Sequence, residues 1–392
     1  MGSNHAARAW GLCACAGALA LVACFRTAQP VHFFASGRPA KLSDWQVVYK
    51  DGGTLALNDG VVPYDLNTPL FSDYAHKLRT VWLPRGKSAK YNADGNFDFP
   101  VGTIISKTFY YPLPQGAARD SLAVARTYDQ SRDFSDSGRG ERGLKLANVH
   151  LIETRILVRR EAGWEALPYV WNSSQTDAML ARTGDTKPLE LVSDDGSKEA
   201  FTYVVPNENQ CAGCHVADLK TKQIAPIGTK ARHLNRDYAY ATVRENQLLH
   251  WTKLGYLTGL TDPASAPKNA DWRDAAQPLD ARARAYLDIN CGHCHNAKGP
   301  ANTTALDLTI FSAADRYLGV CKPPVAAGRG TGDHYFDIVP GHPHDSILPY
   351  RLRSNEPGVM MPEQGRTTTH VEGVALIEQW IATLRGTCDT AT

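Results

Sequence analysis

The sequence predicts an α+β protein of several domains: an N-terminal antiparallel β domain, sandwich-like, followed by mainly α-helical domains. Between residues 43 and 206, short runs of β-branched and aromatic residues alternate with turn pairs such as Asp94-Gly95 and Asp195-Gly196. Apolar residues at helical spacing take over from Asn207. With 392 residues, 43% of them hydrophobic, the chain is long enough for two or three cores.

The N-terminus has the pattern of an export signal. Gly11–Ala23 is a run of 13 small and apolar residues, shorter than the roughly 20 needed to span a bilayer. Leu21-Val22-Ala23-Cys24 resembles a bacterial lipobox, in which the cysteine becomes lipidated and forms the new N-terminus. We therefore expect a signal peptide at residues 1–23, lipidation of Cys24 and a tether at residues 24–42. The alternative is an ordinary cleaved signal with an incidental Cys24.

The β domain has one clear hairpin. Val149–Arg159 and Trp164–Trp171 are rich in strand-forming residues, and Glu161-Ala162-Gly163 separates them as a turn. Thr103–Tyr111 is a further strand with many β-branched and aromatic residues.

Three segments of the second half have helical periodicity. Tyr238–Leu257 carries apolar residues at helical spacing, Ala281–Ile289 follows a possible cap, and Val371–Leu384 is amphipathic. Prolines at 263, 267 and 278 indicate a linker. The predicted divisions are a β-rich domain, a first motif-bearing segment, a linker and a last domain, at residues 43–206, 207–262, 263–279 and 280–392.

Two pentapeptides of the form Cys-X-X-Cys-His carry the chemistry of this chain. Two thiols separated by two residues can bind both vinyl groups of a haem, while the histidine that follows takes one axial position on the iron. The sequence therefore predicts two covalently bound haem c groups. Their predicted attachment and ligand residues are Cys211, Cys214 and His215 for the first and Cys291, Cys294 and His295 for the second.

Two other uses of cysteine pairs fit less well. Zinc ribbons place their pairs about 15 to 20 residues apart, whereas 76 residues lie between Cys214 and Cys291. Cys291-Gly292-His293-Cys294 is similar to the redox motif of disulfide isomerases, which needs a strand before it and a helix after it. Here a helix-like run precedes the motif and Asn296–Pro300 follows it.

The last domain resembles a small class I cytochrome c. The resemblance rests on the helix before Cys291, the pair Met361-Pro362 and the closing helix. It implies that a methionine supplies the second axial ligand of the second haem, with Met361 favoured and Met360 as the alternate. Because a thioether is a soft, weak donor, this ligand would raise the reduction potential relative to two imidazoles.

Taken whole, the chain resembles a family of bacterial two-haem c-type cytochromes. The motifs that carry this resemblance are Asn209-Gln210-Cys211, Leu234–Tyr238, Val339-Pro340-Gly341 and Met360-Met361-Pro362. It implies two haems behind an exported β domain and identifies no redox partner. Together with the lipobox it implies a lipid-anchored, periplasm-facing protein on the inner or outer membrane of a Gram-negative bacterium.

The sixth ligand of the first haem stays open. No methionine occurs between His215 and Met360. His250 and His233 are the local candidates, each with an ordinary structural role as the alternative, and a water-bound or open site also remains. The resemblance to class I cytochromes implies that Pro226 places a backbone carbonyl against the ring of His215.

Two of the 9 cysteines are left after the signal, the lipid site and the haems are assigned. In an exported protein Cys321 and Cys388 are expected to form a disulfide, with two separate thiols as the alternative.

These features favour an electron carrier over a catalyst. The formal net charge is +2, with 42 basic against 40 acidic residues, so nothing indicates nucleic acid as a partner. We expect single-electron transfer with redox partner proteins that the sequence does not identify. The first alternative is a dihaem peroxidase-like or other small-molecule redox enzyme with an open first haem. The second alternative is that the β domain is a docking or ligand-binding module.

Overall fold

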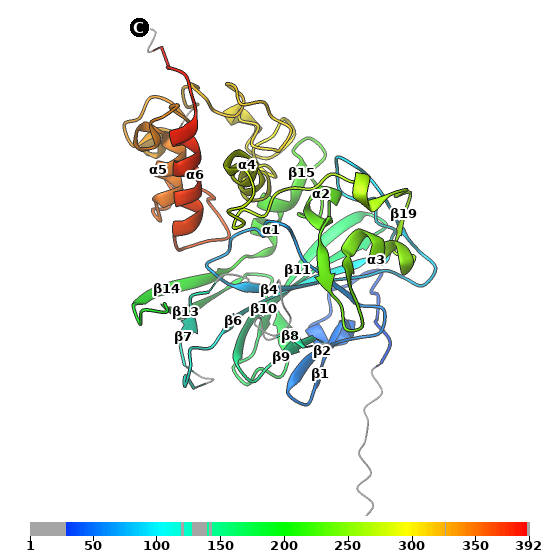
Figure 1. Cartoon of the computed structure of the whole chain (residues 1–392). Helices are drawn as coiled ribbons and strands as arrows, with labels where there is room; N and C mark the ends of the chain where they lie inside the picture. Colours follow the sequence, from blue (N-terminus) through cyan, green and yellow to red (C-terminus); the bar gives the residue numbers. More distant parts are fainter. Residues whose placement is uncertain (1–28, 119–120, 128–138, 141–142, 326, 390–392) are drawn as a thin grey trace, which may run out of the picture.

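The computed structural model describes residues 29–118, 121–127, 139–140, 143–325 and 327–389 (Figure 1). The predicted signal peptide and Cys24 lie outside the described residues. Within these ranges no helix combines the length and the apolar character needed to cross a bilayer.

A six-stranded antiparallel sheet lies at the centre of the molecule. Its strand order is β12-β11-β10-β6-β4-β3. The predicted hairpin is confirmed, because β10 pairs with β11 across a two-residue turn. In sheet order the strands are Ala178–Leu180, Gly163–Trp171, Val149–Arg160, Ile104–Pro112, His76–Trp82 and Val62–Tyr64.

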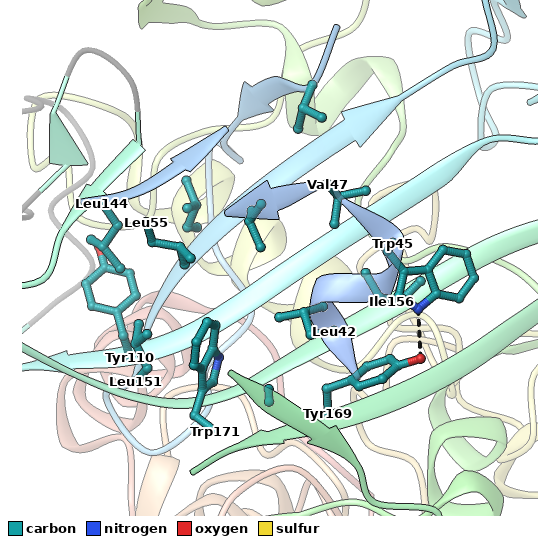
Figure 2. Close-up of a cluster of buried hydrophobic side chains, with 14 of the residues drawn as sticks. Leu42, Trp45, Val47, Leu55, Tyr110, Leu144, Leu151, Ile156, Tyr169 and Trp171 are labelled. Carbon is teal, nitrogen blue, oxygen red and sulfur yellow. Dashed lines mark hydrogen bonds between the residues drawn. The ribbon is translucent and has the colours of Figure 1, made fainter. Parts of the chain in front are cut away.

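A four-stranded sheet packs on one face of this central sheet. Its order is β1-β2-β9-β8, with bounds Val48–Asp51, Thr54–Leu57, Gly143–Lys145 and Arg139–Gly140. Apolar side chains from both sheets form a shared core, in which Trp45 Nε1 donates a 2.7 Å hydrogen bond to Tyr169 Oη (Figure 2). Val31, Phe33 and Phe34 pack against this core, so the described part of the predicted tether lies on the β domain.

The opposite face of the central sheet is covered at its two ends by different elements. At one end lies a three-stranded sheet, β14-β13-β7, formed by Lys198–Val205, Asp185–Val192 and Ala123–Ala125. At the other end, α2 (Ala231–Leu234) and α3 (Gln247–Lys253) pack on Ile105 and Leu157. Between these two covers the sheet face carries charged residues instead of apolar ones.

The prediction of mainly α-helical domains after the β domain is wrong. Six sheets and six α-helices occur in the described chain, and the longest helix has 13 residues. Residues 207–262 hold only the short helices α1 (Glu208–His215), α2 and α3 among strands. These strands are β15 (Val216–Asp218), β16 (Gln223–Ile224), β17 (Asp237–Ala239), β18 (Arg244–Asn246) and β19 (Leu257–Thr258), the last of which pairs with β5 (Ala89–Lys90).

The physical reason is visible in the predicted helix Tyr238–Leu257. Its first part is the β17-β18 hairpin, and only Gln247–Lys253 is helical. Tyr240 of the hairpin stacks on His250 of α3 at 3.5 Å between ring centroids. Asn246 caps α3 with its side chain. Spacing that resembled one helix thus comes from a hairpin and a short helix that pack together.

The last domain keeps the two helices expected at its ends. α4 spans Leu279–Asn290 and α6 spans Val371–Thr383, and they pack on each other in one core with α5 (Ile347–Arg353) (Figure 1). Between α4 and α5 the described residues form turns and 3₁₀ segments, with no α-helix. The Cys321–Cys388 disulfide ties this loop region to the segment after α6.

Candidate functional site

Helix α1 presents the first Cys-X-X-Cys-His motif. The helix begins with a capping box: Asn207 Oδ1 accepts from Gln210 N at 2.8 Å, and Gln210 Oε1 accepts from Asn207 N at 2.9 Å. This cap fixes the point at which the helix begins. The second residue of the cap, Gln210, directly precedes Cys211. Cys211 and Cys214 then lie three residues apart on one helix face, and His215 is the last helical residue.

The ring of His215 is oriented by the backbone. Its Nδ1 lies 2.8 Å from the carbonyl oxygen of Ala225, which fits an Nδ1–H donor and leaves Nε2 as the unprotonated nitrogen. The carbonyl that the sequence suggested near Pro226 therefore belongs to the preceding residue. Burial lowers the pKa of His215 to about 4, so the ring is neutral at pH 7, as an axial ligand must be.

The second motif follows directly after α4. His295 is buried, its Nδ1 lies 3.1 Å from Thr304 Oγ1, and this hydroxyl donates in turn to Ala301 O at 2.7 Å. The threonine oxygen therefore accepts from Nδ1–H and again leaves Nε2 available. Burial lowers the pKa of His295 to about 4. Both motifs thus present a neutral imidazole in which a hydrogen bond holds Nδ1 and leaves Nε2 available.

A cavity of about 470 Å³ lies beside the second motif. Cys291, Cys294, His295 and Met361 line it, whereas Met360 does not. Its volume lies within the roughly 300–1,000 Å³ typical of cofactor sites. The remaining wall is largely apolar, including Leu306, Leu308, Leu318, Ile338, Ile347 and Leu348. Two thiols, an imidazole and a thioether around an apolar space fit a haem.

Arg366 fixes the loop that carries Met361. This side chain is buried, and its Nε and Nη2 donate to the Met361 carbonyl at 3.1 and 2.8 Å. Nη1 donates to Thr368 O, and Nη2 also reaches Ser354 O at 2.8 Å. Because these carbonyls lie on both sides of the loop, one guanidinium group holds Met361 at the cavity wall.

A smaller cavity, about 70 Å³, lies beside the first motif. Cys211, Cys214 and His215 line it, together with Lys107 and Arg155 from the central sheet. The two thiols and the imidazole fit a haem, and the two cations fit its carboxylates. The volume does not accommodate a tetrapyrrole unless side chains of the wall move.

The two cavities share a wall. Cys214, His293 and Met361 line both of them. Cys294 Sγ lies 3.9 Å from the Gly213 carbonyl oxygen, so residues of the two motifs are in contact. The neighbouring Cys294 thiol and the His293 ring lower the pKa of the Cys214 thiol, against the opposing effect of burial.

The four motif cysteines are free thiols. Nowhere in the described ranges do three or more His, Cys, Asp or Glu side chains gather in a way that holds a bare metal ion. The four sulfurs therefore do not form the converging cluster that a zinc ribbon requires.

The two predicted distal histidines line neither cavity. His250 Nδ1 lies 2.7 Å from Glu245 Oε1, and its ring stacks on Tyr240. His233 is buried, with Nε2 3.3 Å from Asp288 Oδ2. The structure thus brings Met361, and neither of these histidines, to the motifs.

Sequence reasoning missed the charged residues at the first motif. Lys107 lies on β6 in an otherwise apolar strand face, and Arg155 lies on β10 beside Glu153, with which it pairs. The available signal was Lys107 between Ile105 and Phe109, because residues two apart on a strand share a face. A lysine on an apolar strand face needs a hydrogen-bond or ion-pair partner.

Comparisons with known proteins give no neighbour for this chain: no protein-family model, no curated protein and no solved structure matches it.

Proposed function

We propose that this chain is a dihaem c-type cytochrome that transfers single electrons. A haem iron bound at each Cys-X-X-Cys-His motif would supply a one-electron couple. The protein's part is to hold each imidazole in one orientation, to keep water from the iron and to set the potential through the second ligand.

The contact between the two motifs carries this proposal. Cys294 Sγ lies 3.9 Å from Gly213 O, and Cys214 and His293 contribute to both cavities. Two redox groups attached at such neighbouring positions have no intervening domain to cross. This arrangement supports an electron relay within one chain.

The residues around each site have separate roles in this function. The Ala225 carbonyl and Thr304 hydroxyl orient His215 and His295, which keeps their Nε2 atoms directed for ligation. Met361 is the proposed second ligand at the larger cavity. As a soft donor it favours the reduced iron and raises the potential there.

Export and membrane attachment belong to the same proposal. A lipidated Cys24 would anchor the protein, facing the periplasm, where cytochrome c maturation and disulfide formation both occur. The redox partners are proteins that dock at the membrane surface.

Haem content tests the proposal directly. Protein expressed with a cytochrome c maturation system should carry the mass of two added porphyrins and give two haems per chain by pyridine haemochrome assay. Cys211→Ala with Cys214→Ala should leave one haem, as should Cys291→Ala with Cys294→Ala. Colourless protein without added mass would remove the proposal.

A second candidate function, a small-molecule redox enzyme, has one observation in its favour. Neither His233 nor His250 lines the cavity at the first motif, whose histidines besides His215 are His293 and His370. If neither of these binds the iron, its sixth position is open to external ligands. Addition of CO to the reduced protein and cyanide to the oxidised protein separates the two functions, because a pure carrier leaves its spectrum unchanged.

A further inference from the structure

A row of three basic side chains crosses the central sheet beneath α1. Arg79 on β4 and Arg155 on β10 are both register partners of Lys107 on β6. All three lie on the face that carries Ile105 and Phe109, because residues two apart on a strand share a face. Like charges directly opposite each other destabilise a sheet, so this row requires compensation.

Two of the three cations are compensated by carboxylates. Arg79 Nη1 donates to Asp65 Oδ1 at 2.6 Å, and Arg155 Nε donates to Glu153 Oε2 at 2.8 Å. Lys107 Nζ makes no hydrogen bond or ion pair with the residues that the structure describes. Lys107 Nζ lies 5.7 Å from the centroid of the Phe109 ring. Burial, followed by the charges of Arg79 and Arg155, lowers the pKa of Lys107 well below its usual range.

Arg155 also keeps donor capacity. Its Nε and Nη2 both bond to Glu153, and no partner for Nη1 occurs in the described ranges. Lys107 and Arg155 therefore present adjacent, uncommitted N–H groups. Both line the cavity that Cys211 and His215 also line.

Neither cation is fully buried: Lys107 is partly exposed, and the Arg155 side chain is 23% exposed. An unpaired ammonium that has lost most of its water is nevertheless stabilised by a negative group beside it. The space that these donors face lies beside the first haem-attachment motif. A haem carries two propionate carboxylates, and Arg and Lys bind carboxylates through short, charge-assisted hydrogen bonds.

We propose that Lys107 and Arg155 bind the propionate carboxylates of the first haem, so that the central β-sheet forms the floor of that site. This inference rests on the proposed function and gives the β domain a role in it. Lys107 is a positioning residue, because it acts on the carboxylates and not on the iron. A free oxyanion bound beside the haem has the same recognition chemistry, and the test must separate the two.

Lys107→Met removes the positive charge and nearly keeps the shape of the side chain, and Lys107→Arg restores the charge. Removal of a cation beside the carboxylates leaves more negative charge near the iron, which favours the oxidised state. In a spectroelectrochemical titration of the dihaem protein, we expect the first haem's midpoint to fall in Lys107→Met and to recover in Lys107→Arg. The second haem's midpoint should stay in place.

Lys77→Met is the matched control. Lys77 lies on the same sheet face and is buried, but its Nζ donates to Ala75 O at 3.0 Å, and it lines neither motif's cavity. This variant should leave both midpoints unchanged. If Lys107→Met instead loses the first haem, peptide masses will show an unmodified Cys211 peptide, and its recovery in Lys107→Arg supports the same assignment.

Two results would overturn the inference. The first is a Lys107→Met protein with two haems and both midpoints unchanged. The second is a saturable shift of the wild-type spectrum on addition of inorganic phosphate or nitrite that Lys107→Met abolishes, since the site then takes a free oxyanion. Failure of the proposed function is distinguishable from both, because wild-type protein would then carry no haem.

Discussion

Replacement of Asp288 by asparagine should strongly destabilise the folded protein. Asp288 lies in α4, three residues before Cys291, and is buried. Its carboxylate accepts from Arg232 Nε at 2.8 Å and from Arg232 Nη2 at 3.2 Å, and Asn269 Nδ2 donates to it at 2.9 Å. This cluster joins α4 to α2, so it connects the elements that precede and follow the linker.

The expected cost follows from burial of both partners. The side chains of Arg232 and Asp288 are only 3% and 2% exposed. Asparagine keeps the shape but removes the charge, which leaves the guanidinium buried without a counter-ion. Breaking a buried pair in this way costs about 3–5 kcal/mol. Replacing both partners with apolar residues, as in Arg232→Met with Asp288→Leu, should cost less than Asp288→Asn alone.

Guanidinium denaturation, followed by haem absorbance and by circular dichroism, gives the free energy of unfolding. Glu356→Gln is the control, because Glu356 pairs with Arg329 on the surface, where the side chains are 53% and 75% exposed. Exposed pairs contribute about 0–1 kcal/mol. An Asp288→Asn loss no larger than that of the control would refute the reasoning.

The same carboxylate predicts an acid limit on stability. Burial acts to raise the pKa of Asp288, but the hydrogen bonds from Arg232 and the charges of His233, Arg232 and Lys230 together outweigh it and hold the pKa well below its usual range. A depressed folded pKa contributes stability that is fully present above the unfolded value of about 3.9 and is lost as pH falls below it. Wild type should therefore lose more stability than Asp288→Asn as the pH falls from about 5 to about 2, roughly the range in which the unfolded carboxyl becomes protonated.

Three further predictions concern ligation, the disulfide and the anchor. Met361→Ala should abolish the far-red iron–thioether absorption band and lower the second haem's midpoint, whereas Met360→Ala should change neither; a reversed pattern would assign Met360 as the ligand. Cys321→Ser opens a disulfide that spans 67 residues and should cost about 4 kcal/mol by denaturation, with Cys388→Ser giving the same loss. Cys24→Ala should release the protein from membranes on fractionation, and retention at the membrane would contradict lipid anchoring.

Local patterns predicted several elements of the fold, whereas the haem sites themselves stay a prediction. The two motifs, the helices around Tyr286 and Ile377 and the β10-β11 hairpin depend on local patterns, and the structure has these helices and strands where the patterns indicated. The predicted helical character of residues 207–262 failed, because short helices and hairpins packed on a sheet produce apolar spacing that resembles one long helix.

The floor of the first site was out of reach of local patterns. Lys107 is meaningful only beside Arg79 and Arg155, which lie 28 and 48 residues away in sequence, and their register across three strands brings them together. The distal candidates lie outside both cavities for a related reason. His233 and His250 are close to the motif along the chain, but His233 contacts Asp288 of α4 and His250 contacts the neighbouring Glu245.

The small size of the first cavity bears on the order of assembly. A pocket of about 70 Å³ is smaller than the tetrapyrrole it is proposed to carry, so either the side chains of its wall move to admit the cofactor or the cofactor is attached to its thiols while the polypeptide is still open. Cys214 and Cys294 add a hazard, because neighbouring thiols from different motifs can cross-link in an oxidising compartment if the chain closes first. Attachment of the haem before the chain folds would avoid both problems. Chains that fold first would remain without haem.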